Sequence, residues 1–158
     1  MLTDTLLAKK IMFPAELKIL KDGEFQDTNQ NLKNANHLRI ISIVDGACMK
    51  CIINQLNYTD IAFSSFTRKD KDLIFILNVS SNDSSFFMNN LYPSIETKSL
   101  ILWDNNFNFE RTNKLFTSDL NLRTFMIDSN NYIIHYGNPV MNPEEINTYK
   151  QKYLKHIK

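Results

Sequence analysis

The chain has 158 residues, enough for one domain with a hydrophobic core and few for two. Hydrophobic residues make up 43% of the chain and charged residues 22%, as in an ordinary globular protein. Eighteen basic and seventeen acidic side chains give a net charge of +1, so the composition indicates neither a nucleic-acid partner nor an anionic membrane surface. No apolar run is long enough for a membrane-spanning helix, and the first residues lack the pattern of a secretory signal.

The N-terminal region predicts little regular structure. Between residues 6 and 20 we expect a short strand and a loop, because Pro14 ends the apolar run of residues 11–13. Residues 21–37 are polar, rich in Asn and without a period, which is typical of a surface loop.

The pattern changes at residue 38, where a strand, a helix and a second strand follow one another. Residues 38–44 form an apolar, β-branched run, as expected of a strand buried on both faces. Residues 45–47 interrupt the run, and apolar residues then recur at helical spacing from Cys48 to about Lys69. Residues 73–79 are a second buried strand, so the three elements predict a right-handed parallel unit.

The remaining residues predict shorter elements that complete an α/β domain. In chain order, they are a short helix around residues 84–91 ended by Pro93, a strand at 100–103, a hairpin of strands 122–128 and 132–136 with an Asn-rich turn, and a closing helix with Pro143 in its first turn. We expect Trp103, Phe107 and Phe109 to pack in the core or at its edge, Asp104 to lie in a turn rather than a calcium loop, and His135 to be a structural histidine.

Both cysteines of the chain belong to one C-x-x-C motif, Cys48-Met49-Lys50-Cys51. The spacing alone suits redox chemistry or half of a zinc site. Zinc needs two further ligands, and His37, His135 and His156 are scattered along the sequence. A purely structural disulfide is a second alternative, although so short a loop removes little unfolded-state entropy. Two unrelated buried thiols are a third.

The position of the motif favours redox chemistry over these alternatives. A buried strand ends just before Cys48 and a helix begins there, so Cys48 lies where free N–H groups and the helix dipole favour a thiolate. A thiolate attacks a substrate disulfide, and a thiol one turn later resolves the mixed disulfide.

At these residues the chain resembles thioredoxin-like thiol–disulfide oxidoreductases, most closely the TlpA type of bacterial envelopes. The resemblance rests on residues 39–44 leading into the motif, on the Thr124 to Asp128 hairpin strand, and on Gly137-Asn138-Pro139 before the last helix. It implies a thioredoxin-like α/β fold, with a central mixed sheet flanked by helices on both faces. It also implies a single domain of residues 1–158, in which 1–37 are an N-terminal extension with short extra strands and 38–158 are the core. By this resemblance Cys48 attacks and Cys51 resolves.

Three positions depart from the thioredoxin pattern. Ala47 replaces a bulky aromatic residue, Ser42 replaces a buried acid six residues before the first cysteine, and Arg123 replaces the cis-proline that faces the cysteines. Because a cis bond before a non-proline residue costs about 2.5–4 kcal/mol, we expect a trans peptide before Arg123. Its guanidinium could stabilise the Cys48 thiolate, accept an anionic group of the substrate, or point to solvent.

The sequence therefore predicts an oxidoreductase that acts on protein thiols or disulfides with a redox partner protein. It needs no cofactor or metal beyond a redox-active Cys48–Cys51 disulfide. Further candidates for the substrate groove or for stabilising the thiolate are Ala47, Met49, Lys50, Arg123 and Thr124, although Lys50 could equally be a solvated surface lysine. The alternative is a non-catalytic binding or assembly module with a structural or vestigial cysteine pair. We expect the periplasm or cell envelope if an upstream signal or lipid anchor was removed; otherwise the location is unknown.

Overall fold

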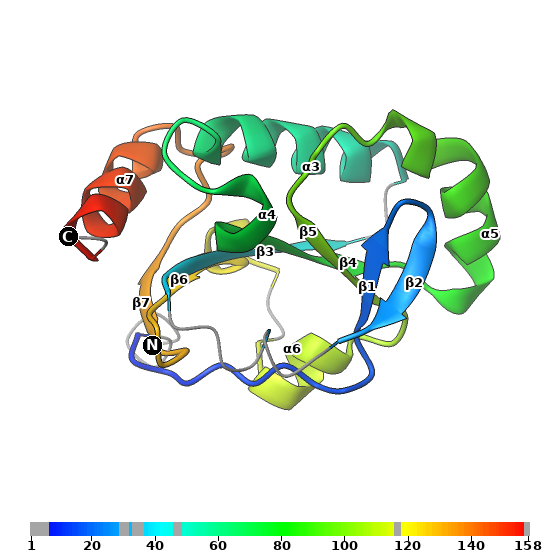
Figure 1. Ribbon diagram of the computed structural model, residues 1–158, viewed down its shortest axis with the longest axis horizontal. Coiled ribbons are helices and arrows are strands. Elements are labelled where there is room, and N and C mark those ends of the chain that lie inside the picture. The colour runs from blue at the N-terminus through cyan, green and yellow to red at the C-terminus, as the bar shows by residue number, and fades with distance from the viewer. Residues whose placement is uncertain (1–6, 29–31, 33–36, 46–48, 116–117, 157–158) are drawn as a thin grey trace.

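The computed structural model describes residues 7–28, 32, 37–45, 49–115 and 118–156. In this part of the chain seven strands form one mixed sheet in the order β2-β1-β5-β4-β3-β6-β7 (Figure 1). The strands are β1 Lys18–Lys21, β2 Glu24–Asp27, β3 Arg39–Asp45, β4 Leu73–Asn78, β5 Leu100–Asp104, β6 Thr124–Ile127 and β7 Ile133–Tyr136.

The centre of the sheet is the parallel pair β3 and β4, which the apolar runs predict. Ile43 of β3 pairs with Ile76 of β4, and every residue of the two strands is buried except Asp45. Beyond β4 lies parallel β5, and β6 pairs antiparallel with β3 on its other side. Burial on both faces explains why these strands read as continuous β-branched runs rather than as an alternation.

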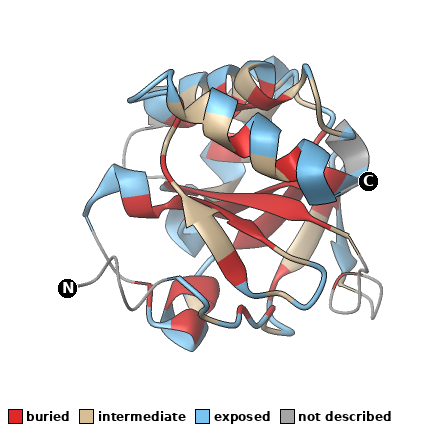
Figure 2. Ribbon diagram, turned by 90° about the vertical axis from the view of Figure 1, so that its left-hand side faces the viewer, coloured by how far each residue is buried: buried red, intermediate tan, exposed pale blue. Residues whose placement is uncertain are grey.

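Helices cover both faces of the sheet, as expected of the predicted fold class (Figure 1). The α-helices of the described residues are α3 Met49–Phe63, α4 Lys69–Asp72, α5 Ser84–Phe86, α6 Asn108–Asn113 and α7 Glu145–His156. Figure 2 shows the buried strands between helices whose outer sides are exposed. No helix of the described part is long and apolar enough to cross a membrane.

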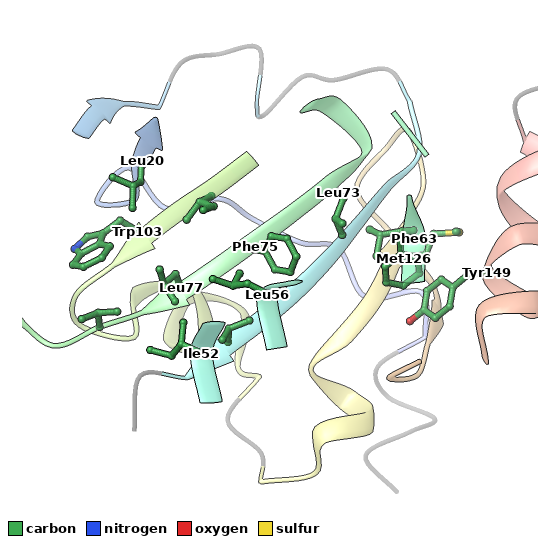
Figure 3. Packing of buried hydrophobic residues seen from close by; sticks show 14 of the residues in the cluster. Leu20, Ile52, Leu56, Phe63, Leu73, Phe75, Leu77, Trp103, Met126 and Tyr149 are labelled. Carbon is green, nitrogen blue, oxygen red and sulfur yellow. The ribbon is translucent and has the colours of Figure 1, made fainter. Parts of the chain in front are cut away.

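Two apolar clusters hold the helices to the sheet. On one face, Ile52, Leu56 and Phe63 of α3 pack against the sheet together with Tyr149 of α7 (Figure 3). On the other face, Phe109 of α6 is fully buried. Burial of this apolar surface is the main force that fixes the helices on the two faces.

The helix expected from Cys48 to about Lys69 is shorter in the structure. Helix α3 ends at Phe63, and a separate four-residue helix, α4, begins at Lys69. At the end of α3 the Thr67 hydroxyl donates to the Phe63 carbonyl at 2.6 Å, and the Ser64 hydroxyl donates to the Ile61 carbonyl. Such side-chain bonds satisfy backbone groups locally and compete with continuation of the helix.

The N-terminal region contains short extra strands, as the resemblance implies, although the residue pattern alone predicts a loop over part of them. Residues 24–27, expected in a loop, form β2, which pairs with β1 across a turn at Asp22 and Gly23 that has positive φ at both residues. The strand expected between residues 6 and 20 lies later than its apolar run, at β1, while Lys10 makes only an isolated bridge to Tyr132. Four exposed residues carry no burial pattern, so β2 was invisible in the sequence.

Smaller corrections concern the other predicted boundaries. The chain continues as a helix past the predicted stop at Pro93, which lies in the 3₁₀ turn Tyr92–Ser94 after a π-helical turn, Phe87–Leu91. A proline is tolerated there because the first residues of a new helical turn need no N–H donor. Helix α7 begins at Glu145, two residues after Pro143.

Candidate functional site

The described half of the cysteine motif lies at the start of α3. Cys51 is the third residue of this helix, is exposed and takes part in a disulfide bond. Cys48, the other cysteine of the sequence, and Ala47 lie outside the described residues. Met49 and Lys50 are the first two residues of α3. Since β3 ends at Asp45, the predicted junction of a buried strand with a helix is present around the motif.

A buried hydroxyl, that of Ser42, occupies the strand position where the resemblance would place an acid, and a second hydroxyl lies next to it. Ser42 of β3 pairs with Thr124 of β6, and their hydroxyl oxygens lie 3.0 Å apart. Both residues are buried. A hydroxyl pair of this kind satisfies its own hydrogen bonds and carries no charge, so it cannot replace a carboxylate as a base.

Four polar residues, here called the Arg123 cluster, meet where β3 and β4 end: Asp45, Asn78, Glu110 and Arg123. The two guanidinium nitrogens of Arg123 lie 3.1 and 3.2 Å from the carboxylate oxygens of Glu110. A third contact joins Arg123 to Asp45 at 3.1 Å. The Asn78 amide donates to both carboxylates, at 3.1 Å to Asp45.

The charged side chains of the cluster differ in how far they are exposed to solvent. The side chains of Arg123 and Glu110 are 6% and 2% exposed, whereas that of Asp45 is 46% exposed. The alternative that Arg123 points to solvent is therefore wrong. A buried guanidinium needs carboxylate partners, and two carboxylates on one cation leave a net negative charge on the cluster, with Asp45 as its accessible member.

The backbone around Arg123 joins the cluster to the sheet. The described residues contain no cis peptide bond, which confirms the trans peptide expected before Arg123. The Arg123 carbonyl accepts a hydrogen bond of 2.8 Å from the amide of Ile43 on β3. This bond extends the pairing of β3 and β6 by one residue beyond Ser42 and Thr124.

A cavity of about 350 Å³ opens beside the Arg123 cluster. We call it the α3 groove, because side chains of α3 line it, and we call the part lined by Asp45 and Arg123 its floor. Its lining residues are Ser42, Ile43, Val44 and Asp45 of β3, Gln55 and Thr59 of α3, Ser118, Leu120 and Arg123 before β6, and Asn138, Val140 and Met141 after β7. Two lining residues, Ser42 and Arg123, are positions that the sequence analysis singled out as departures from the thioredoxin pattern. The sequence did not single out the others.

Glu110 belongs to helix α6, and the carboxylate of Asp104 holds the first residues of this helix in place. Asp104, at the end of β5, accepts hydrogen bonds from the backbone amides of Asn108 at 3.0 Å and Phe109 at 2.9 Å. Asp104 is buried, and its role in this turn agrees with the sequence prediction. Sequence reasoning missed Glu110 and Asn78 because nothing local marks them: each acquires its role from a partner more than ten residues away.

Of the remaining candidates, Trp103 and Phe109 pack in the core, as predicted. Trp103 is buried against Phe25 and Phe87, and Phe109 packs on Phe13. Only Phe107 departs, since it is 43% exposed. His135 is half-buried, and its Nε2 lies 2.8 Å from a carboxylate oxygen of Glu145 on α7.

Together, the mixed sheet, the parallel β3–α3–β4 unit, the antiparallel β6–β7 hairpin and the closing helix define a thioredoxin-like fold.

No protein-family model and no curated protein matches the chain, but solved structures do. An uncharacterised thioredoxin-like protein of Porphyromonas gingivalis has 18% identity and a TM-score of 0.54, over 93% of this chain and 94% of that one. The thioredoxin domain of a Bacteroides vulgatus thiol–disulfide oxidoreductase has 10% identity and a TM-score of 0.60, over 93% and 97%. Peroxiredoxin Q of Xanthomonas campestris has 11% identity and a TM-score of 0.61, over 94% and 98%. At these identities the similarity establishes the fold.

Proposed function

We propose that this protein is a thiol–disulfide oxidoreductase that acts on protein thiols or disulfides through Cys48 and Cys51, in the manner of the TlpA type. The observation that carries the proposal is the position of Cys51: an exposed cysteine in the first turn of α3, directly beyond the central strand β3 of a thioredoxin-like fold. The oxidoreductase from Bacteroides vulgatus has the same fold, which supports the proposal.

In the proposed reductive cycle the Cys48 thiolate attacks one sulfur of a substrate disulfide and displaces the other sulfur as a thiolate. Cys51 then attacks the mixed disulfide and releases the second substrate thiol. The substrate gains two electrons and two protons, and the two cysteines become a disulfide. A dithiol protein partner restores the reduced state, and the oxidative direction uses the same steps in reverse.

Activation of Cys48 rests on the helix in this proposal. Amides at the N-terminus of a helix as long as α3 lower the pKa of a thiol in its first turn or cap. Lys50 adds a positive charge in the sequence next to Cys51. Arg123 contributes less, because Glu110 and Asp45 already neutralise its guanidinium.

The test is reduction of the insulin disulfides with dithiothreitol as electron donor, combined with titration of the Cys48 thiol. We expect turnover by the wild type, loss of at least about 100-fold in Cys48→Ser, and stable mixed disulfides with substrate in Cys51→Ser. We also expect the pKa of Cys48 to lie clearly below the ordinary value of about 8.5. Met12→Ser, at an exposed position outside the cysteine motif, is the control and should keep wild-type turnover.

Three outcomes contradict the proposal. An ordinary thiol pKa without insulin turnover would favour the alternative, a binding or assembly module, which the uncharged Ser42–Thr124 pair and the neutralised Arg123 make plausible. Consumption of an alkyl hydroperoxide without insulin turnover would instead indicate a peroxidase, the activity class of the peroxiredoxin neighbour. Zinc in the purified protein at one ion per chain would indicate the metal-site alternative. Placement in the periplasm or envelope remains part of the proposal and depends on the upstream sequence.

A further inference from the structure

We propose that the α3 groove binds an extended polypeptide segment that carries a bulky apolar side chain next to a basic one. As a statement about substrates this rests on the proposed function, because α3, the helix that carries Cys51, also lines the groove through Gln55 and Thr59. The binding itself does not require the redox chemistry. The inference follows from the shape of the groove, its apolar rim and the charge on its floor.

Three apolar side chains that line the groove, here called its rim, are exposed. Leu120, Val140 and Met141 are 38%, 41% and 55% exposed, and all three line the same cavity. They come from two segments on either side of the β6–β7 hairpin, residues 118–123 and 138–141, that the fold brings together. Exposed apolar side chains that gather around a cavity mark an interaction surface, whereas single ones scattered over a protein do not.

The floor of the groove is polar and carries a net negative charge. Asp45 lines the cavity and is the accessible carboxylate of the Arg123 cluster. Arg123, which also lines it, is held by Glu110 from behind. Among the described side chains of this floor, one cation faces two carboxylates, which leaves an excess negative charge at Asp45. An ammonium or guanidinium group complements this charge and an anionic group does not.

A polypeptide suits this surface better than an enclosed small molecule. The cavity, at about 350 Å³, lies at the lower end of the range of about 300–1,000 Å³ for small-molecule sites. Its three exposed apolar side chains are accessible from outside the cavity and can contact the flanks of a long ligand. A segment with one side chain in the cavity, a second on the rim and a basic group at Asp45 uses all three features.

The experiment measures binding of two fluorescein-labelled peptides without cysteine to the full chain by fluorescence anisotropy. The peptides are Gly-Ser-Leu-Phe-Ser-Lys-Lys-Ser-Gly and the same sequence with Glu in place of both Lys. At low salt we expect the basic peptide to bind about tenfold more tightly, with a preference that falls as salt rises. Asp45→Asn should reduce the preference to less than about threefold, because only one carboxylate then remains beside Arg123.

Two matched controls separate the groove from the rest of the surface. Met141→Ser should weaken both peptides about three- to tenfold, whereas Met12→Ser, at 57% exposure and outside the groove, should weaken neither. Asp22→Asn removes an exposed charge elsewhere and should leave the preference unchanged. Equal affinities, a preference for the acidic peptide, a preference that survives Asp45→Asn, or no binding of either peptide would each overturn the inference.

The result is independent of the redox test. Selective binding of the basic peptide by a protein that does not reduce insulin would leave this inference standing and refute the proposed function. Insulin turnover without selective peptide binding would do the reverse.

Discussion

Asp72 illustrates how single charged residues are accommodated in this protein. Its side chain is fully buried, yet it accepts hydrogen bonds from the Arg68 guanidinium at 3.0 and 3.1 Å, from the Arg68 backbone amide and from the Tyr153 hydroxyl. His37 lies 3.5 Å away. Burial by itself raises the pKa of Asp72, but the hydrogen bonds from Arg68 and Tyr153 outweigh it, and the pKa is lowered from 3.8.

This lowered pKa predicts a pH-dependent contribution to stability. A carboxyl group whose pKa is lower in the folded state stabilises the fold fully above its unfolded pKa and loses that contribution as the pH falls through the folded pKa. We therefore expect Asp72→Asn to cost about 1–3 kcal/mol at pH 7 and progressively less below about pH 3.8. Urea unfolding of both proteins between pH 7 and pH 3 measures the difference. A deficit that is the same at every pH would contradict the prediction, and Asp22→Asn is the exposed control.

Arg39 shows the opposite solution, a buried cation held by neutral groups. Its guanidinium donates to the Leu32 carbonyl at 2.6 Å and to the Asn131 side chain, and it lies 5.3 Å from the ring of Phe13. Burial lowers the pKa of Arg39 to about 10. The side chain is still charged at neutral pH, and it ties the start of β3 to the turn of the β6–β7 hairpin.

At the scale of elements, several side-chain contacts hold the junction of β7 with α7. Tyr149 of α7 is buried, and its hydroxyl lies 2.9 Å from the Thr124 carbonyl and 2.6 Å from the Gly137 carbonyl. Burial raises the pKa of Tyr149 well above 10, so the phenol stays a neutral donor. Glu145 adds the contact with His135 across the same junction. Gly137 therefore lies where a helix and a strand approach closely.

A side chain at Gly137 should cost stability, because the backbone has positive φ and the Glu145 carboxylate would have to move. It has φ of +150°, and a Cβ atom there would lie 2.7 Å from Cδ of Glu145. Gly23 has φ of +78° but no atom within 4 Å of such a Cβ. We expect Gly23→Ala to cost about 1 kcal/mol and Gly137→Ala at least about 1 kcal/mol more. Thermal or urea unfolding of the two variants is the measurement, and equal costs would show that the collision with Glu145 is relieved without loss of stability.

At the scale of the whole molecule, the N-terminal hairpin is part of the sheet. Strand β1 pairs antiparallel with β5, with Ile19 opposite Leu102. Leu20 of β1 and Trp103 of β5 belong to one apolar cluster, and Figure 3 shows them at the same end of it. Residues predicted to form an extension thus complete the core.

Removal of Leu20 should accordingly destabilise the entire fold. We expect Leu20→Ala to cost about 2–5 kcal/mol in a single transition, coincident by fluorescence of Trp103, the single tryptophan of the chain, and by far-ultraviolet circular dichroism. Leu154→Ala, at a position 38% exposed, should cost less than about 1 kcal/mol. A separate early transition of Leu20→Ala in circular dichroism would show instead that the hairpin unfolds on its own.

The sequence by itself determined the central elements. Residues buried on both faces must be apolar along their whole length, so β3 and β4 were visible as continuous runs, and the apolar period of α3 and the turn residues of the β6–β7 hairpin were visible for similar reasons. The sequence also predicted that the cysteine motif lies where a buried strand ends and a helix begins, and Cys51 is the third residue of α3. Strand β2 was not visible, because four exposed residues have no burial pattern and depend on a neighbouring strand for their hydrogen bonds.

Only the tertiary structure decided the burial of Arg123 and the partners of its guanidinium. Its sequence position suggested three different environments, and its neighbours in the chain do not distinguish them. Glu110 lies 13 residues away and Asp45 lies in another strand, and the fold brings both to the guanidinium. The same folding joins Leu120 to Val140 and Met141 around the α3 groove. Charge pairing and surface shape depend on contacts between distant residues, whereas burial of a strand or helix leaves a local pattern that the sequence records.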